Sequence, residues 1–192
     1  MTNVYLIGYR CCGKSSAGRL LAARLGWSFV DTDEQVAARA GQTITALVSR
    51  RGWEHFRKLE RACLADIAGA KGLVVATGGG VIVDSQNIAA MKTTGVVVWL
   101  TASAGVIRTR MHGDAQTADQ RPALTACDTH HEIESVLAER TPFYRAASDI
   151  LVDTDRETLS TLVEILMDRL RLLGIKPDRR TKSRIDADHG HP

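Results

Sequence analysis

The sequence contains few cysteines, only four in 192 residues. They form no C-x-x-C pair and have no Cys/His spacing of the kind that binds metal, which argues against a zinc module. Thiols without such a pattern fit a reducing compartment better than a disulfide-stabilised secreted scaffold. The four are Cys11, Cys12, Cys63 and Cys127.

Long hydrophobic runs and a strong charge of one sign are also lacking. No apolar run reaches the ~18 residues that a membrane span needs, and the run over 3–8 is too short and lacks the charged start of a secretory signal. The formal net charge is only +3, without a basic stripe carrying interleaved aromatic residues. We therefore expect a cytoplasmic protein with neither a membrane nor a nucleic acid as partner.

Short β-branched runs alternate with amphipathic stretches along the chain. The runs are nearly all apolar, as expected of parallel strands that are buried on both faces. This alternation predicts an α/β sandwich around a parallel sheet, and the length suits one domain, over 1–173. Strands are predicted at Val4–Ile7, Ser28–Val30, Leu73–Ala76, Val96–Leu100 and Ile150–Val152, and helices at 14–25, 33–51, 53–69, 84–93, 103–111, 128–147 and 156–173, with Asp84 and Asp128 as N-caps.

Two segments differ in composition from this pattern. Residues 112–127 are polar, with Gly113 as a candidate hinge, and a loop of that length in a compact domain is often a lid, which we place at about 109–124. Residues 174–192 combine glycine, two prolines and mixed charge with almost no apolar residue. This composition predicts a disordered tail.

A phosphate-binding loop is predicted at Gly8–Ser15, which reads Gly-Tyr-Arg-Cys-Cys-Gly-Lys-Ser and matches G-x-x-x-x-G-K-[ST]. It follows a predicted strand and opens a predicted helix, so backbone N–H groups and the helix N-terminus would face one anion. Lys14, which we expect in a solvent-facing loop, can reach the β- and γ-phosphates, and the Ser15 hydroxyl can bind Mg²⁺. The residues expected to bind ATP here are Cys11, Cys12, Gly13, Lys14, Ser15 and Ser16.

Cysteine at position 11 departs from the commonest form of this loop, which carries a further glycine there. A larger residue is tolerated only if the local dihedral angles allow it. Cys11 and Cys12 also lie beside Lys14 and a helix N-terminus, a setting that favours the thiolate and oxidation. The alternative, that they are two small loop residues without a redox role, is the reading we prefer.

Asp31-Thr32-Asp33 lies at the carboxyl end of the second predicted strand, where open α/β sheets bind ligands. On an extended chain both carboxylates can point the same way. One could serve hydrated Mg²⁺, and the other could accept a proton from a substrate hydroxyl. The alternative is that one of them only caps the next helix.

Two further patterns could bind a substrate. Arg57 and Glu60 form an i,i+3 pair on a predicted helix, for which a surface salt bridge is by itself the more frequent explanation. Gly78-Gly79-Gly80 directly follows a predicted strand and would let a ligand approach the backbone closely. A plain loop turn is the alternative for the glycines.

Taken together, the phosphate loop, D-T-D, F-R-x-x-E, G-G-G, R-P and R-x-x-x-Y-R resemble shikimate kinases over roughly 3–172. The stretch 52–57 and the long polar segment before Arg121 resemble the longer-lid bacterial members of that family. The resemblance implies a P-loop fold like that of the nucleoside monophosphate kinases, with five parallel strands in a three-layer sandwich. It also implies transfer of the γ-phosphoryl of ATP to the 3-hydroxyl of shikimate, in chorismate and aromatic amino acid biosynthesis.

Residue roles follow from the same resemblance. It implies that Asp33, Arg57, Gly79 and Arg140 lie at shikimate, with Gly80 beside them, and that the two arginines hold the carboxylate. The acceptor-binding helices would span about 33–69. A guanidinium fork suits a carboxylate on physical grounds as well.

The ATP side is assigned in the same way. Asp31 would help to hold Mg²⁺ through water, with Ser15 as the direct ligand. Lys14, Asp33 and Arg121 are the expected catalytic residues, with Arg121, before Pro122, reaching the phosphates from the lid. Arg108 and Arg156 match positions near the adenine. We expect a monomer that uses ATP, shikimate and Mg²⁺.

Two other functions remain open at this point. A related metabolite kinase, such as a gluconate kinase, should lack the arginine pair Arg57 and Arg140 around a D-T-D motif. A nucleotide-binding module without turnover should have lost Asp33 or the lid arginine, and both are present here.

Overall fold

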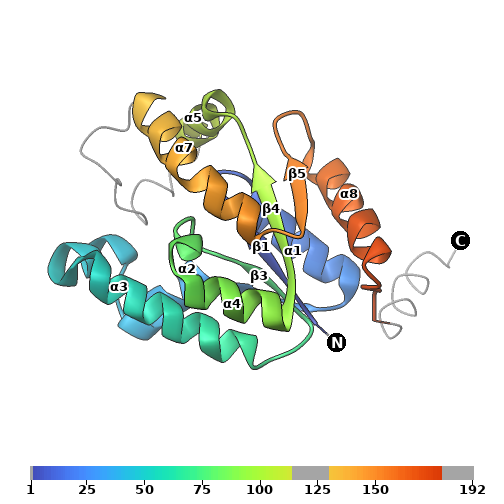
Figure 1. Cartoon of the computed structure of the whole chain (residues 1–192), viewed down its shortest axis with the longest axis horizontal. Helices are drawn as coiled ribbons and strands as arrows, with labels where there is room; N and C mark the ends of the chain where they lie inside the picture. Colours follow the sequence, from blue (N-terminus) through green and yellow to red (C-terminus); the bar gives the residue numbers. More distant parts are fainter. Residues whose placement is uncertain (1, 114–129, 179–192) are drawn as a thin grey trace, which may run out of the picture.

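A computed structural model describes residues 2–113 and 130–178 and contains one five-stranded parallel sheet at its centre (Figure 1). The strand order is β2-β3-β1-β4-β5, and every neighbouring pair is parallel. The predicted α/β class and the five parallel strands are thereby confirmed. The strands are β1 Asn3–Ile7, β2 Ser28–Asp31, β3 Leu73–Ala76, β4 Gly95–Thr101 and β5 Ile150–Asp153.

Alternating residues of the central strand β1 belong to different halves of the core. Val4 and Leu6 pack in one hydrophobic cluster, whereas Tyr5 and Ile7 pack in the other. All four side chains are fully buried, because helices cover both faces of the sheet. This double burial is the physical reason why the central strand reads as an apolar run without alternation.

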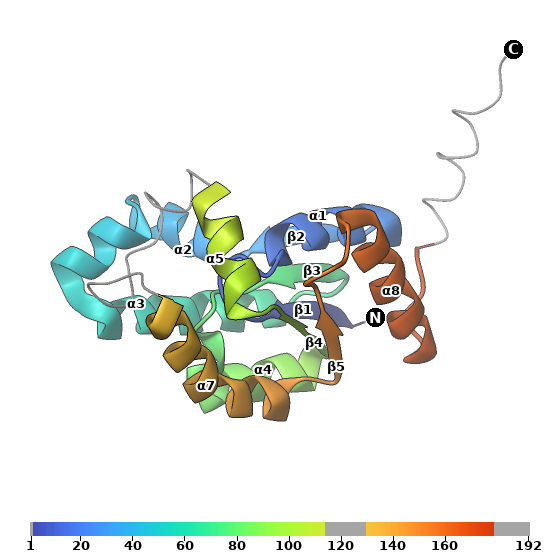
Figure 2. The ribbon, with the colours of Figure 1, turned by 90° about the horizontal axis from the view of Figure 1, so that it is seen from above.

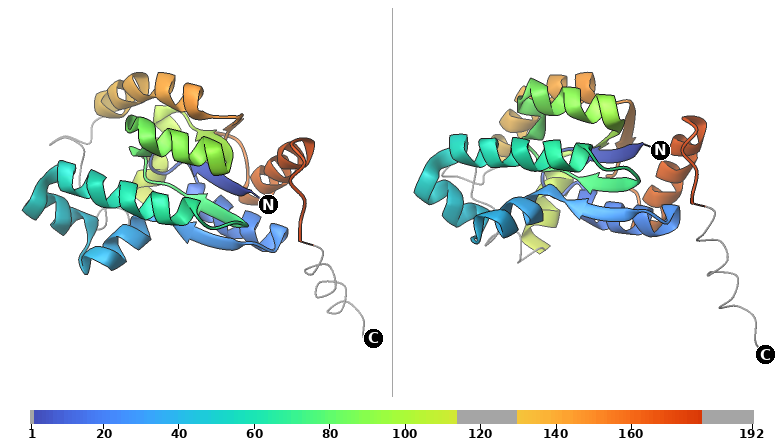
Figure 3. Two further views of the ribbon diagram at one scale, coloured as in Figure 1. Left: turned by 60° about the horizontal axis from the view of Figure 1, so that its bottom comes forward. Right: turned by 90° about the horizontal axis from the view of Figure 1, so that it is seen from below.

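Helices form the two outer layers of the sandwich (Figure 2). α1 and α8 pack on each other and on the cluster that contains Leu6, whereas α3, α4 and α7 contribute to the cluster that contains Tyr5. The views in Figure 3 show α3 alongside α4 on that second face. The helices are α1 Lys14–Leu25, α2 Thr32–Ala40, α3 Ile44–Ala68, the 3₁₀ helix η1 Val81–Val83, α4 Ser85–Thr94, α5 Ala104–Gly113, α7 His130–Ala147 and α8 Leu159–Leu172.

The helical breaks between the second and third strands differ from those predicted. A single helix over 33–51 was expected, but α2 ends at Ala40 and Gly41 adopts a left-handed conformation with φ 62°. α3 then continues past the predicted boundary, with Gly52 as a kink at φ 77° and ψ 168°. Both breaks occur at glycine, the residue that tolerates positive φ, and only the one at Gly52 was anticipated.

The described part of the predicted tail, residues 174–178, is ordered, contrary to the prediction. Ile175 is buried in the core cluster with α8, and the Asp178 amide donates to the Leu25 carbonyl over 2.8 Å. The first five residues of 174–192 are therefore ordered against the domain, because Ile175 supplies an apolar anchor. The remaining tail residues and most of the expected lid lie outside the described residues, as do Asp128 and Cys127, whereas 109–113 belong to α5.

The strand order places the ligand-binding edge of the sheet. β1 lies between β3 and β4, so the loop after β1 is central, and the carboxyl ends of β2 and β3 lie beside it. Open α/β sheets bind ligands outside the carboxyl ends of their strands. Within the described part of the chain, no helix is both long and apolar enough to cross a membrane.

Candidate active site

The predicted phosphate loop connects β1 to the N-terminus of α1. Gly13 precedes the helix in a left-handed conformation, with φ 86°, and no side chain of the described residues caps the helix. Other helices of the protein are capped by the side chains of Asp31, Thr43, Asp84 and Thr158, which includes the cap predicted at Asp84. The first amide groups of α1 and the positive end of its dipole are therefore left without a side-chain cap, an arrangement that suits an anion.

Lys14 is buried within this loop, contrary to the expectation that it would face solvent. Its side chain donates hydrogen bonds to the carbonyls of Gly8, over 2.8 Å, and Tyr9, over 2.6 Å. Only 6% of Lys14 is exposed. The ammonium group thus holds the loop in a curled shape around itself, in the position from which it can also reach a phosphate.

Asp31 links the phosphate loop to the helix that follows β2. Its Oδ2 atom accepts a hydrogen bond from the Ser15 hydroxyl over 2.7 Å, and its Oδ1 atom accepts the Asp33 amide over 3.0 Å. Asp31 is therefore both a helix cap and a partner of the serine. Because the helix begins at Thr32, Asp33 is not on an extended chain, and the premise that the two carboxylates align along a strand is wrong.

The second loop cysteine, Cys12, does not have the environment predicted for a reactive thiol. Burial raises the pKa of the Cys12 thiol, and the nearby charges of Lys14 and Arg110 only partly oppose this effect. Cys12 is 1% exposed, which supports the reading without a redox role. Cys11 is the only non-glycine residue with positive φ, at 59°, in the described ranges. Its position is one that a glycine would occupy without strain.

One cavity lies beside the phosphate loop at the carboxyl ends of β1, β2 and β3. It gathers side chains from α2, α3 and α7 with the backbone of the glycine loop. All of the residues predicted to bind the acceptor contribute to it. The lining residues are Tyr9, Arg10, Asp33, Ile44, Trp53, Phe56, Arg57, Glu60, Gly78, Gly79, Gly80 and Arg140.

The Arg57–Glu60 pair forms part of this cavity and is not a surface salt bridge. Arg57 Nη1 lies 2.6 Å from Glu60 Oε2, and only 1% of the Glu60 side chain and 25% of the Arg57 side chain are exposed. Burial raises the pKa of the Glu60 carboxyl despite the opposing charge of Arg57. Glu60 Oε1 has no hydrogen-bond partner among the described residues, so a buried acceptor atom is left for a ligand.

The glycine loop lets three side chains approach its backbone closely. A Cβ atom at Gly80 would lie 2.0 Å from Arg57 Nη2, and one at Gly78 would lie 2.7 Å from both Asp33 Oδ1 and Glu60 Oε1. Any larger residue would displace the guanidinium or the carboxylates. Glycine at positions 78 and 80 therefore leaves space for these three side chains against the loop backbone.

Arg140 reaches the same loop from α7. Its Nη1 atom donates to the Gly79 carbonyl over 3.3 Å, and that carbonyl also accepts the Tyr144 hydroxyl. The Nε atom of Arg140 is buried without a hydrogen-bond partner in the part of the chain that the structure describes. A donor and, at Glu60, an acceptor thus remain unsatisfied in one cavity.

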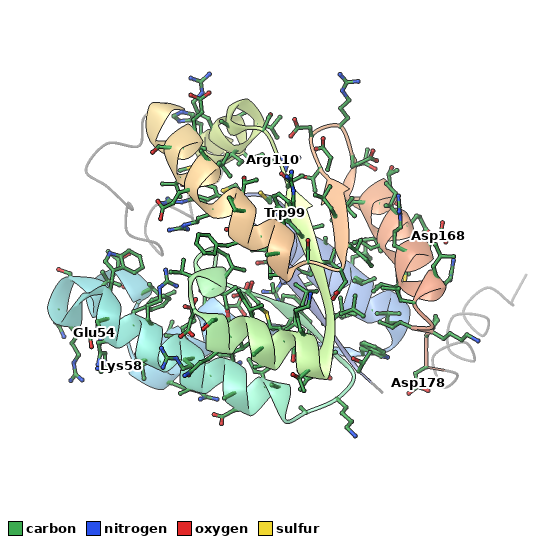
Figure 4. All side chains as sticks on the ribbon, viewed as in Figure 1. Glu54, Lys58, Trp99, Arg110, Asp168 and Asp178 are labelled. Atoms are coloured by element: carbon green, nitrogen blue, oxygen red, sulfur yellow. The ribbon has the colours of Figure 1, made fainter. Side chains whose placement is uncertain are left out.

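A second cavity, of about 340 Å³, adjoins the other side of the phosphate loop. Arg110 crosses it, donating to the Cys11 carbonyl over 3.3 Å, the Thr154 hydroxyl over 3.0 Å and the Thr154 carbonyl over 2.6 Å. Figure 4 shows Arg110 near the carboxyl end of β4, where Trp99 also lies. The cavity is lined by Cys11, Cys12, Gly13, Ser16, Arg110, Thr154, Glu157, Leu159 and Leu162.

Arg108 and Arg156, predicted near the adenine, are exposed and do not line this cavity. Arg110, and not Arg108, lines the cavity and contacts both the phosphate loop and Thr154. Since α5 turns about 100° per residue, positions 108 and 110 lie on different sides of it. Arg121 lies outside the described residues.

Several cavity residues were missed from the sequence. Arg10 and Trp53 line the acceptor cavity although no role was assigned to either, and their proximity to the phosphate loop and to Arg57 in the sequence was the available signal. Arg110 had no such signal, because its partners Thr154 and Cys11 are 44 and 99 residues away.

This fold and site define a P-loop phosphotransferase with a charged acceptor cavity beside the phosphate loop. The family model for shikimate kinase matches residues 10–171. A shikimate kinase of Nitratidesulfovibrio vulgaris is 43% identical over 152 residues, which cover 79% of this chain and 86% of the relative. One from Syntrophus aciditrophicus is 36% identical and covers 88% and 91%. The chain belongs to the shikimate kinase family.

Solved structures agree with this assignment. Shikimate kinase from Acinetobacter baumannii in complex with shikimate superposes with a TM-score of 0.84 at 28% identity, covering 92% of this chain and 96% of that one. A gluconokinase from Sinorhizobium meliloti has a TM-score of 0.55 at 17% identity, covering 90% and 93%. The second likeness shows the shared fold alone.

Proposed function

We propose that this chain transfers the γ-phosphoryl group of ATP to the 3-hydroxyl of shikimate, with the acceptor bound in the cavity around Arg57 and Arg140. The observation that carries this proposal is the pairing of unsatisfied groups in that cavity. Among the residues that the structure describes, Arg140 Nε is a donor without a partner, and Glu60 Oε1 is an acceptor without one. Buried polar atoms of this kind are normally satisfied, and a hydroxylated carboxylic acid supplies both an acceptor and donors.

The acceptor would be oriented by charge at two points. Arg57 and Arg140 line the cavity and suit a carboxylate because each guanidinium offers parallel N–H donors. Asp33 lines the same cavity and, as a carboxylate, can accept a hydrogen bond from a ring hydroxyl. We assign Gly79 and Gly80 to close backbone contact with the ring.

ATP would bind across the phosphate loop. Its phosphates would meet the uncapped N-terminus of α1 and Lys14, whose present partners, the carbonyls of Gly8 and Tyr9, compete with the phosphates for the same ammonium group. The cavity beside Arg110 and Ser16 would take the nucleoside. We retain Arg108 and Arg156 near the adenine and Arg121 on the phosphates as proposals.

The residues present fit a magnesium ion bound with ATP. Ser15 and Asp31 supply hydroxyl and carboxylate oxygens 2.7 Å apart, and Mg²⁺ prefers oxygen ligands. In the described part of the chain, no group of three or more His, Cys, Asp or Glu side chains could hold a metal alone, so phosphates and water would complete the coordination. Bound there, Mg²⁺ would neutralise charge on the phosphates.

Catalysis would consist mainly of positioning, since phosphoryl transfer needs little covalent chemistry from the protein. Asp33 would orient the 3-hydroxyl and remove its proton, and Lys14 and Arg121 would stabilise charge on the transferred group. Exclusion of water from the closed site would prevent hydrolysis of ATP. We further propose that the enzyme acts as a cytoplasmic monomer.

Release of ADP tests this function. A coupled assay supplies Mg-ATP together with shikimate, quinate or gluconate as the acceptor. Of these three acceptors, only shikimate should give rapid turnover, and the rate without any acceptor should be a slow background. Removal of Mg²⁺ by a chelator should stop the shikimate-dependent release of ADP. Preference for gluconate would indicate a related metabolite kinase, and nucleotide binding without turnover for any acceptor would indicate a regulatory module.

A further inference from the structure

Two buried hydroxyl groups hold the Gly78–Gly80 loop, and neither belongs to a residue that lines the acceptor cavity. The first is that of Thr32, the central residue of the D-T-D motif. Its Oγ1 atom accepts the Gly78 amide over 3.0 Å, and Thr32 is fully buried. This hydrogen bond fixes the start of the loop against the N-terminus of α2.

The second hydroxyl belongs to Tyr144, on α7. It donates to the Gly79 carbonyl, while the ring stacks on Trp99 with centroids 5.6 Å apart and planes 18° apart. Tyr144 is fully buried. Burial raises the pKa of its hydroxyl, so Tyr144 stays a protonated donor across the range in which the enzyme can be assayed.

The Gly79 carbonyl connects this tyrosine to the substrate arginine. The same oxygen accepts Arg140 Nη1 over 3.3 Å. With one nitrogen of the guanidinium held in this way, the orientation of the remaining N–H groups is restricted. These include Nε, which has no partner among the described residues. Tyr144 therefore acts on Arg140 through a shared acceptor, from one helical turn further along α7.

We propose that Thr32 and Tyr144 are positioning residues for the acceptor, which hold the glycine loop at consecutive residues and so orient Arg140 toward the substrate carboxylate. This inference rests on the function proposed above. The inference goes beyond that function because it assigns part of the affinity for the acceptor to two hydroxyl groups outside the cavity. A preorganised loop and arginine would not have to be ordered when the acceptor binds, which strengthens binding.

A matched control is available on the central strand β1. Tyr5 is also fully buried, and its hydroxyl is bonded to Thr94 Oγ1 over 2.7 Å and to Asn3 Nδ2 over 3.2 Å. It lies on β1 away from both cavities. Tyr5→Phe thus removes a buried tyrosine hydroxyl of the same kind without touching the site.

The test is calorimetric titration of Tyr144→Phe, Thr32→Val and Tyr5→Phe with shikimate and with a non-hydrolysable ATP analogue. Loss of one hydrogen bond should weaken shikimate binding ~10-fold in the first two variants. Binding of the analogue should stay within about 2-fold in all three variants, and Tyr5→Phe should bind shikimate as the wild type does. Equal shikimate affinity of Tyr144→Phe and wild type would overturn the proposal.

A double-mutant cycle between Tyr144→Phe and Arg140→Lys separates positioning from a general loss of stability. Because Tyr144 acts through Arg140, the two losses of shikimate affinity should not multiply in the double variant. Multiplicative losses would overturn the assignment. If Thr32→Val does not fold, the shikimate affinity of Tyr144→Phe and the double-mutant cycle still test the proposal. Wild-type protein that fails to bind shikimate would refute the proposed function instead.

Discussion

The Ser15 hydroxyl donates a hydrogen bond to the Asp31 carboxylate over 2.7 Å. This contact joins the first turn of α1 to the end of β2, and it sets two oxygen atoms at the edge of the phosphate loop. The other oxygen of Asp31 caps α2. One carboxylate therefore serves the proposed magnesium site and fixes the helix that carries Asp33.

Asp31→Asn should separate these two roles. Asparagine caps helices about as well as aspartate, so the free energy of unfolding should change by less than about 0.5 kcal/mol. The lost charge should raise the Mg²⁺ concentration for half-maximal rate by about 10-fold or more. Rate titrations with Mg²⁺ and urea unfolding measure the two effects. Asp31→Ala, which lacks the cap as well, should also lose about 1 kcal/mol of stability.

Lys14→Ala should abolish most turnover and also weaken the loop. Loss of the charge at the transferred group should lower kcat by about 10²–10³-fold. Because the Gly8 and Tyr9 carbonyls lose their donor, the free energy of unfolding should fall by about 1–3 kcal/mol. Steady-state kinetics and thermal unfolding report these changes. Lys58→Ala, at an exposed ion pair with Glu54 on α3 (Figure 4), is the control, and a near-normal kcat for Lys14→Ala would refute the assignment of the loop.

Asp33→Asn should affect catalysis more than folding. The amide keeps the shape of the side chain but cannot take the proton of the acceptor hydroxyl, so kcat should fall by about 10²-fold. Kinetics at saturating ATP and shikimate measure this loss, with Asp168→Asn on the far helix α8 as the matched control. A variant that kept more than about a tenth of wild-type kcat would be incompatible with a base role.

Arg57→Lys and Arg140→Lys should weaken shikimate binding without affecting ATP. Lysine keeps the charge but loses the planar fork, so each change should cost about 1.5–3 kcal/mol of shikimate affinity. Calorimetry with shikimate and with an ATP analogue separates the two ligands. Arg121→Lys should instead lower kcat and leave shikimate affinity without nucleotide unchanged. The acceptor cavity would be misassigned if Arg57→Lys impaired the analogue and spared shikimate.

Glu60 should make the folded protein less stable as the pH rises. Burial raises its pKa above the usual 4.5, so the folded state binds this proton more tightly than the unfolded chain does. The resulting stabilisation of the folded state is complete below pH 4.5. It is lost as the pH rises through the raised pKa of Glu60 in the folded protein. The glutamine of Glu60→Gln cannot titrate, so the wild type should lose stability relative to this variant as the pH rises through that range. Urea unfolding at a series of pH values tests this, and parallel curves for the two proteins would contradict it.

Local patterns predicted much of the site because its residues follow strand ends in the sequence. The phosphate loop comes directly after β1, Asp31 ends β2, and Gly78 lies two residues beyond β3. In a parallel sheet these ends share one edge, so their proximity follows from the strand assignment alone. The fold class was equally accessible, because five apolar runs leave few alternatives.

Features that depend on packing were not accessible in this way. The burial of Glu60 beside Gly78 and the contact of Arg110 with Thr154 arise from segments far apart in the sequence. The break at Gly41 was missed because a single glycine in a helical pattern does not by itself decide between a kink and an end. Ile175 lies in a polar segment, and its role as an anchor depends on contacts with α8.

The central claim is that this chain phosphorylates shikimate at its 3-hydroxyl. Correlated ³¹P and ¹H NMR of the products formed from ATP and shikimate tests it most directly, since it identifies both the acceptor and the oxygen. We predict one new phosphate monoester signal, correlated with the ring proton at carbon 3 and increasing in step with ADP. A new signal correlated with another ring proton, or release of ADP and inorganic phosphate without a monoester, would contradict the account.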